Sequence, residues 1–357
     1  MRGRISAGAA MMVARGLRSG AATMIVVLPT FWSMQQLALW RKPPVDAIVF
    51  AVMLGIALPR ALARARWADA PAIGVLLGPA CAAAVGCGML LSDGGASRAV
   101  GAVAFSAGAA IAVWLRRFGS AWRAAGTVAS TLFLAVLVRL APLPRTWSQL
   151  GWMLVAAGVA LVWALALRCL TVAVQPAPSR RPAAGLPAST RMAVQLGCGT
   201  LASFAAAQWL DPDHLVWPVL TVMVVHSANR GRGDVLRKGA QRTVGALVGT
   251  GAGTVLGGLF QTGSRTALVA LFAVLALAAA ARPYGYLFWS AGVTAALVFL
   301  YSYFGESGAD LLARRLLGIA VGGAIGMTAA WFVLPVRRRG RSIRLGGPGN
   351  RPPTLDT

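Results

Sequence analysis

Twelve apolar runs, separated by short polar or basic stretches, dominate the sequence. A helix that crosses a membrane needs about 20 mostly apolar residues. A mean hydropathy of +0.69 and a charged fraction of only 12% exclude a soluble enzyme, a disordered tail and a secreted disulfide module. The sequence therefore predicts an all-α polytopic membrane protein with about 12 transmembrane helices. The runs lie near residues 20–40, 45–59, 72–91, 97–115, 123–140, 147–170, 191–210, 214–228, 242–260, 266–281, 287–304 and 312–335.

The basic residues are distributed in a way that predicts topology. The chain has 34 Lys and Arg against 9 Asp and Glu, a net charge of +25. These cations lie between the apolar runs, and 26 of the 34 fall in one alternate set of connections, which includes both termini. Cytoplasmic loops carry the excess of Lys and Arg, so we expect both termini in the cytoplasm and contacts with anionic lipid head groups. No nucleic-acid partner is expected.

The two halves of the sequence resemble each other. Four small residues of the third run recur 171 positions later in the ninth run, and further matches have offsets of 166–171. This pattern predicts two six-helix repeats with the same orientation, an arrangement that places a transport pathway at the interface of the repeats. The expected domains are a first repeat at 1–175, a Pro-rich cytoplasmic linker at 176–190, a second repeat at 191–336 and a basic cytoplasmic tail at 337–357.

Glycines recur every fourth residue in three of the runs. This spacing opens a groove on one helix face, so that a neighbouring backbone can approach closely. Close helix packing is the first interpretation, and a sliding interface or a conduit is the alternative. The pattern R-x-x-G-x-x-x-G also occurs twice, from Arg242 and from Arg315, which is consistent with a nested inverted repeat of three plus three helices. The predicted packing glycines are Gly74, Gly78, Gly245, Gly249, Gly253, Gly257, Gly318, Gly322 and Gly326.

Motifs of catalysis and of cofactor binding are absent from the sequence. It contains no G-x-x-x-x-G-K-[ST], no H-E-x-x-H and no G-x-S-x-G, and Glu306 is its only glutamate. The four cysteines lie in apolar runs with no metal-ligand spacing, and there are two histidines. We expect no enzyme activity, no cofactor and no metal site. Glu306, Asp310, Arg314 and Arg315 are expected to form local pairs at the outer face.

The segment from His214 to Gly245 carries most of the candidate chemistry. A short apolar run with Trp217-Pro218 leads into a basic loop and then into a glycine-striped run. The basic loop either concentrates anions or serves only as a topology signal. The Trp217 ring either stacks an aromatic substrate or anchors the helix at the interface, and His226 either couples protons or makes a structural hydrogen bond. The candidate pathway residues are Trp217, Thr221, His226, Arg230, Arg237, Lys238 and Arg242.

This segment resembles the fusaric acid resistance/aromatic acid exporter (FUSC) family of bacterial inner-membrane proteins. That family shows a W-P-x-x-T-V span, a basic loop and R-x-x-G-[TA]-x-x-G at the start of the next span. The matching residues here are Trp217, Pro218, Thr221, Val222, Lys238, Arg242, Gly245 and Gly249. The resemblance covers about 190–336. It implies secondary efflux of small aromatic carboxylic acids or related organic anions across the bacterial inner membrane, with a periplasmic adaptor protein for some relatives.

Two departures from this family keep other functions open. The first half matches only through the repeat, and the large cytoplasmic domain of many relatives has no counterpart in this sequence. A non-transporting membrane partner or scaffold subunit is therefore one alternative. A different twelve-span secondary transporter of the major facilitator type is another, although the loop signature of that superfamily does not fit Gly55 to Arg60 or Asn229 to Asp234. A membrane enzyme acting on lipids lacks an acid/base or metal cluster. The sequence leaves the oligomeric state open.

Overall fold

The computed structural model describes residues 2–62, 66–137, 148–170, 188–210, 216–226, 232–304 and 309–334. These ranges form twelve α-helices and three short 3₁₀ turns, with no β-strand among them. The predicted all-α fold is confirmed, and the described helices number twelve, although not all of them meet the length and hydropathy of a membrane span. The helices are α1 (Arg2–Arg41), α2 (Val45–Leu62), α3 (Ala70–Ser92), α4 (Gly95–Trp114), α5 (Ser120–Leu137), α6 (Ser148–Leu170), α7 (Ala188–Leu210), α8 (Val216–His226), α9 (Arg232–Leu259), α10 (Arg265–Ala281), α11 (Tyr286–Tyr303) and α12 (Ala309–Phe332).

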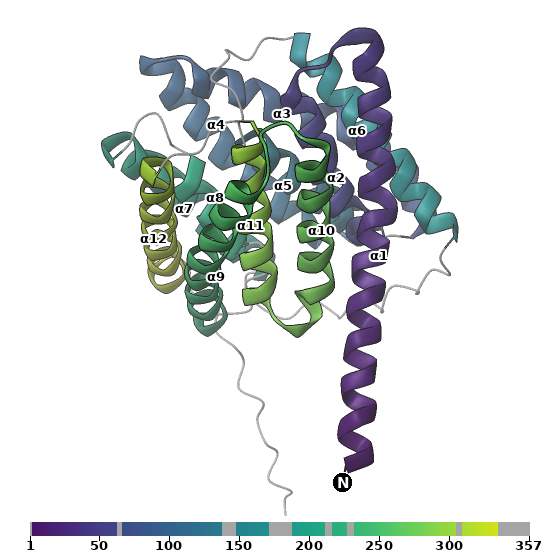
Figure 1. Ribbon diagram of the computed structural model, residues 1–357. Coiled ribbons are helices and arrows are strands. Elements are labelled where there is room, and N and C mark those ends of the chain that lie inside the picture. Colours follow the sequence, from purple (N-terminus) through teal and green to yellow (C-terminus); the bar gives the residue numbers. More distant parts are fainter. Residues whose placement is uncertain are drawn as a thin grey trace, which may run out of the picture.

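Nine of the helices in the described ranges are long and apolar enough to cross a membrane, namely α1–α6 and α10–α12. Helix α8 is apolar but has only 11 residues. At a rise of about 1.5 Å per residue it is about half as long as the hydrocarbon core is thick. Helix α1 has 40 residues, and its first turns project beyond the ends of the neighbouring helices (Figure 1).

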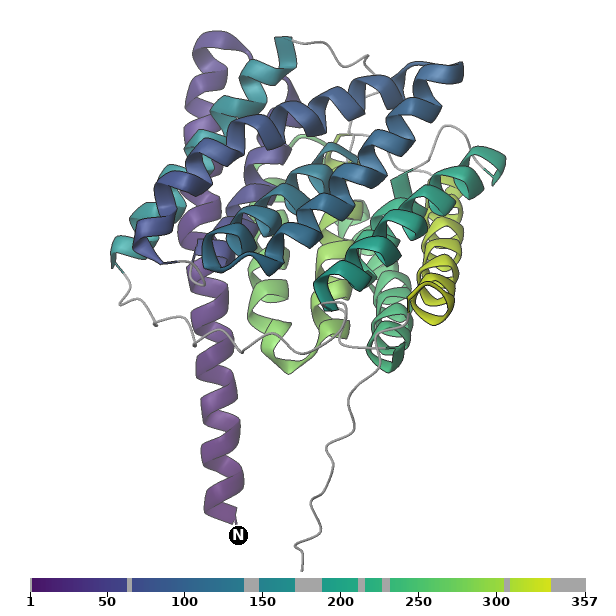
Figure 2. The ribbon, with the colours of Figure 1, turned by 180° about the vertical axis from the view of Figure 1, so that it is seen from behind.

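The first helix of each half packs against the other half. Helix α1 contacts α10, and α7 contacts α4. Helices α9–α12 stand upright beside α1, whereas α3, α4, α5 and α7 are inclined and lie in front of them in Figure 2. Several helix pairs recur in the two halves: α2 packs on α6 as α8 packs on α12, and α3 packs on α5 as α9 packs on α11. The two predicted repeats are thus packed with each other over several helices.

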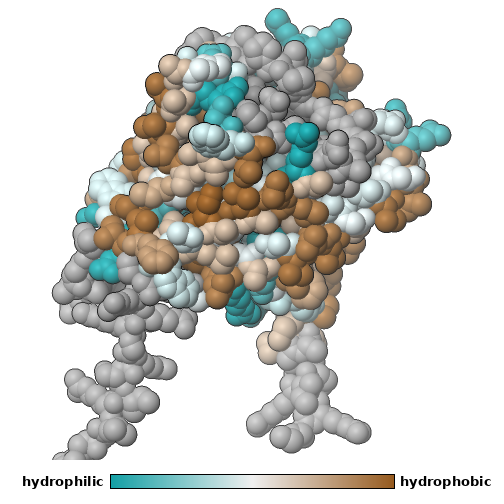
Figure 3. Space-filling view, turned by 90° about the vertical axis from the view of Figure 1, so that its left-hand side faces the viewer, coloured by the Kyte–Doolittle hydropathy of each residue, from teal (hydrophilic) through white to brown (hydrophobic). Residues whose placement is uncertain are grey.

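The outer surface is suited to lipid. Apolar residues form a broad band across the middle of one side of the molecule, and hydrophilic residues gather toward its top and bottom (Figure 3). Large apolar side chains on several helices point outward, with Val75 74% exposed, Val162 64% exposed and Leu277 70% exposed. In water such a surface would promote aggregation, whereas in a bilayer it is the surface expected to face the lipid chains.

A polar corner joins four helices at one end of the first half. The 3₁₀ turn Trp67–Asp69 joins α2 to α3. The Asp69 carboxylate accepts a hydrogen bond from the backbone N–H of Arg66 at 2.9 Å and from the hydroxyl of Ser120, at the start of α5, at 2.7 Å. The Arg168 guanidinium of α6 lies 4.5 Å over the Trp67 ring and donates to the carbonyl of Leu62, the last residue of α2.

This corner predicts a pH dependence of stability. Burial raises the pKa of Asp69, but the hydrogen bonds from Ser120 and Arg66 outweigh it, and the net pKa lies below the ordinary value of 3.8. The folded state therefore favours the ionised carboxylate, and the stabilisation is present above pH 3.8 and lost as the pH falls below it. We expect Asp69→Asn to lower the melting temperature at pH 7, and the difference from the wild type to shrink as the pH falls below 3.8. A constant difference between the two proteins at all pH values would contradict this.

Candidate functional site

A cavity of about 630 Å³ lies between the two halves of the chain. The first half lines it with α1, α2 and α5, and the second half with α8, α9, α10 and α11. Its volume falls in the range of ligand-binding pockets, about 300–1,000 Å³. It would hold roughly 20 water-sized groups at about 30 Å³ each. The interface of the halves, where the repeat predicts a pathway, therefore contains space for a small organic molecule.

The cavity follows α2 and α11 along most of their length. Its wall contains Val45, Ile48, Val49, Val52, Met53, Ile56, Ala57 and Arg60 of α2, which share one helical face. From Val45 to Arg60 the helix rises about 22 Å, compared with about 30 Å for the hydrocarbon core. Helix α11 lines the opposite side from Tyr286 to Tyr303. The cavity therefore extends over much of the thickness of a membrane.

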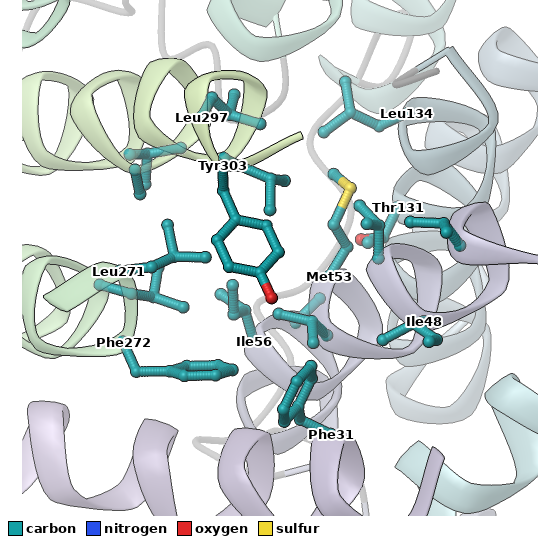
Figure 4. Close-up of a pocket in the computed structure, with 18 of the residues that line it drawn as sticks. Phe31, Ile48, Met53, Ile56, Thr131, Leu134, Leu271, Phe272, Leu297 and Tyr303 are labelled. Atoms are coloured by element: carbon teal, nitrogen blue, oxygen red, sulfur yellow. The ribbon is translucent and has the colours of Figure 1, made fainter. Parts of the chain in front are cut away.

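The middle of the cavity is apolar and partly aromatic. Figure 4 shows Leu271, Ile56 and Met53 pointing toward the cavity around the ring of Tyr303. The rings of Phe31 and Phe272 meet edge to face there, with their centroids 4.9 Å apart. A further aromatic ring can pack against these two rings in the same edge-to-face arrangement. The middle of the cavity is therefore suited to an apolar or aromatic body.

Cationic groups lie at both ends of the cavity. At one end Arg60 of α2 and Arg242 of α9 are in the wall. The Arg60 guanidinium lies 5.0 Å from the centre of the Trp289 ring, and that of Arg282 lies 5.1 Å from the same ring. At the other end Lys42, between α1 and α2, lines the cavity. The arginine-rich end belongs to the connections that the charge pattern places in the cytoplasm.

Arg242 is the predicted candidate that lies in the cavity wall. Its side chain is only 3% exposed, and one terminal nitrogen donates to the hydroxyls of Ser290 at 3.3 Å and Thr294 at 3.4 Å on α11. Its Nε has no hydrogen-bond partner among the described residues. A buried guanidinium that is held by neutral hydroxyls keeps its positive charge available to an anion in the cavity.

The candidates on α8 lie behind the cavity. That helix contributes Leu220 and Val224 to the wall, and not Trp217, Thr221 or His226. Trp217 is 3% exposed and meets the ring of Tyr301 edge to face, with centroids 6.3 Å apart. The Thr221 hydroxyl donates to the Trp217 carbonyl at 2.9 Å. Both side chains are therefore engaged within the protein.

His226, the last residue of α8, is fully buried. Its Nδ1 lies 3.1 Å from the carbonyl oxygen of Val222, one turn earlier, which is the distance of a hydrogen bond donated by the ring. Its ring also packs on Gly326 of α12. The structural hydrogen bond that the sequence offered as one interpretation of His226 is therefore present.

The segment predicted as a basic loop is helical from Arg232 onward, as the start of α9, and it contributes one residue to the cavity. Arg230 lies outside the described residues. Arg237 is exposed on α9, and Lys238 pairs with Asp234 one turn earlier at 2.8 Å. Of this group, only Arg242 lines the cavity in the described part of the chain.

The comparison with known families finds a match in the second half of the chain. Residues 186–329 match the family described as fusaric acid resistance protein-like. The match places a fusaric acid resistance protein-like domain at residues 186–329, within the second half of the chain. No curated protein and no solved structure matches the chain. The nine apolar helices and this domain identify the chain as a multi-pass membrane protein of the transporter class.

Two glycine stripes of the fusaric acid resistance protein-like domain lie at close helix crossings. A methyl group on Gly249 of α9 would collide with the Ala291 carbonyl of α11, and one on Gly322 of α12 would collide with the Pro218 carbonyl of α8. In the first half the equivalent contacts are loose, since a Cβ on Gly74 would lie 3.8 Å from Leu161 and one on Gly78 would have no neighbour within 4 Å. Among the predicted packing glycines, the closest crossings are therefore those of the second half.

The structure also reveals a buried arginine that the sequence analysis placed elsewhere. Arg315 was expected in local pairs at the outer face, but it is only 2% exposed, and its guanidinium lies 4.3 Å over the Trp217 ring. The reason is that Gly318, one turn later, lets α12 approach α8 at Trp217 and Pro218. The repeated pattern R-x-x-G-x-x-x-G was the signal that could have identified it.

Proposed function

We propose that the protein exports small aromatic carboxylic acids or related organic anions across the bacterial inner membrane by a secondary mechanism. The observation that carries this proposal is the cavity between the halves, which has an apolar, aromatic-lined middle and the buried cation Arg242 at one end. The cation would hold the carboxylate, and the rings of Phe31 and Phe272 would pack against the aromatic body.

The two halves would form the pathway together. We propose that 1–175 and 191–336 are two repeats with the same orientation and that both termini lie in the cytoplasm, as the distribution of Lys and Arg indicates. The shared helix pairs and the exchange of α1 and α7 between the halves support this arrangement. Rocking of one half against the other would open the cavity alternately to each side. The arginine-rich end would then collect anions from the cytoplasm.

A pair of matched variants on α10 tests the role of the cavity. Leu271 lines the cavity, whereas Leu277 is 70% exposed on the outer surface of the same helix. Leu271→Trp should reduce the export of benzoate and hydroxybenzoates strongly, because the larger ring fills the space that the substrate would take. Leu277→Trp should export as the wild type does. The measurement is the accumulation of these acids in efflux-deficient cells, with equal amounts of each protein in the membrane.

The same measurement distinguishes export from the scaffold alternative. A non-transporting partner would leave accumulation unchanged whether or not the protein is present. Three kinds of cells are compared: cells with the wild type, cells with Leu271→Trp and cells without the protein. If all three accumulate the acids equally although both proteins are well inserted, the result contradicts export and favours the scaffold.

A further inference from the structure

Arg315 is a buried cation that the proposed route through the cavity does not use. It lies on α12, is 2% exposed, and is not part of the cavity wall. The Cζ atom of its guanidinium lies over the Trp217 ring, 4.3 Å from the ring centre. Its Nε and Nη2 have no hydrogen-bond partner among the described residues. Burying a guanidinium in a membrane protein is costly, so such groups mark functional sites.

The two nitrogens without partners form one edge of the guanidinium. Nε–H and the N–H of Nη2 that points the same way lie parallel in a plane, and their spacing matches the two oxygens of a carboxylate. The Trp217 ring holds this plane in place from one face. The edge is therefore preorganised for a bidentate hydrogen bond to a carboxylate.

Comparison with Arg242 shows which side chains stand opposite each of the two buried arginines. Arg242, Gly245 and Gly249 recur 73 positions later as Arg315, Gly318 and Gly322. In both copies the glycines admit a neighbouring helix, α11 in the first copy and α8 in the second. The side chain closest to Gly245 is that of Ser290, whereas the side chain closest to Gly318 is that of Trp217.

The neighbouring helices provide different chemistry in the two copies. The hydroxyls of Ser290 and Thr294 on α11 accept hydrogen bonds from Arg242. Ser290 and Thr294 lie 73 positions after Trp217 and Thr221 of α8. Trp217 offers a ring face, and the Thr221 hydroxyl donates to the Trp217 carbonyl. The second copy has thus replaced the hydroxyl acceptors of the first with an aromatic face.

We propose that Arg315 and Trp217 form a second anion subsite that binds the carboxylate of a small organic acid, separate from the cavity. Trp217 and Tyr301 pack with Val49 and Leu300, two residues of the cavity wall, so the subsite lies directly behind that wall. The charges of Arg315 and Arg242 repel each other, and a bound carboxylate relieves this repulsion. The choice of ligand rests on the proposed function, whereas the site itself rests on the Arg315 edge.

Binding of radiolabelled benzoate to the full-length protein in lipid nanodiscs tests the subsite. The wild type is expected to bind at two sites. Arg315→Lys keeps the positive charge but loses the planar edge, so binding at one site should weaken at least about tenfold, as expected for losing a charge-assisted hydrogen bond. The matched control is Arg314→Lys, which changes the neighbouring, exposed arginine of the same helix and should bind as the wild type does.

The outcomes separate this subsite from the proposed export route. Wild-type affinity and stoichiometry in Arg315→Lys would overturn the subsite, and a loss confined to Arg242→Lys would then leave the cavity site standing. A loss in Arg315→Lys with normal binding in Arg242→Lys would support the subsite and contradict the role of Arg242. No binding of benzoate by the wild type would overturn the subsite, while the export measurement would still test the transport function independently.

A structure of the wild-type protein with 4-iodobenzoate gives a test that does not depend on a variant folding. Iodine density near Trp217, with the carboxylate on the Arg315 edge, is the expected result. Iodine density confined to the cavity would overturn the proposal.

Discussion

Arg242→Gln should lower the export of an aromatic carboxylate by roughly 10- to 100-fold, the factor expected for losing a hydrogen bond to a charged group. The substitution removes the buried positive charge from the cavity wall. A glutamine amide can still donate to the hydroxyl of Ser290 or Thr294, which now bond to the guanidinium. The contact between α9 and α11 is therefore retained, and the amount of protein in the membrane should not change.

The control for this prediction is Arg237→Gln. Arg237 lies on the same helix, has the same charge and is exposed, so its loss should have little effect on export. Uptake of labelled benzoate into inverted membrane vesicles measures the rate directly. Equal rates for Arg242→Gln and the wild type would remove Arg242 from the pathway. Equal losses in both variants would instead indicate that the general positive charge of this end, and not a specific contact, attracts the anion.

The helices could be predicted from the sequence because each depends on a local pattern. Long apolar runs and the breaks between them give all twelve helices, and the turns contain glycines with positive φ, such as Gly119 and Gly263. Arg242 could be identified because it opens a glycine stripe beside a Trp-Pro motif, a local signal. The length of α1 was underestimated, since its first turns carry Arg15 and Arg18 and do not read as part of an apolar run.

The cavity and the position of Arg315 could not be predicted in the same way, because both depend on which helices touch. The pairing of α1 with α10 joins residues that are far apart in the sequence, and no local pattern specifies it. Arg314 and Arg315 are adjacent and chemically identical, yet the side chain of Arg314 is exposed and that of Arg315 is buried. The reason is that adjacent residues on a helix point about 100° apart. Only the placement of α8 decides which of them meets a ring.

Gly249→Ala should destabilise the protein more than other small changes on α9. The added methyl group would collide with the carbonyl oxygen of Ala291 and lie 2.8 Å from Cβ of Thr294, so α9 and α11 would have to move apart. Overpacking of this kind costs about 1–3 kcal/mol or more. The expected result is a lower melting temperature of the purified protein and a smaller amount of it in the membrane.

Gly251→Ala is the matched control, because it makes the same chemical change two residues later on the same helix, at a position with no atom within 4 Å of the added Cβ. There the gain in helix propensity, about 1 kcal/mol, is not opposed by a clash, so stability should be unchanged or slightly higher. Equal stability of the two variants would contradict the close crossing of α9 and α11.

Because that crossing also brings Ser290 and Thr294 to Arg242, Gly249→Ala should lose stability and export together, whereas Arg242→Gln should lose export alone. This difference separates the packing role of the glycine stripe from the anion-binding role of the arginine that precedes it.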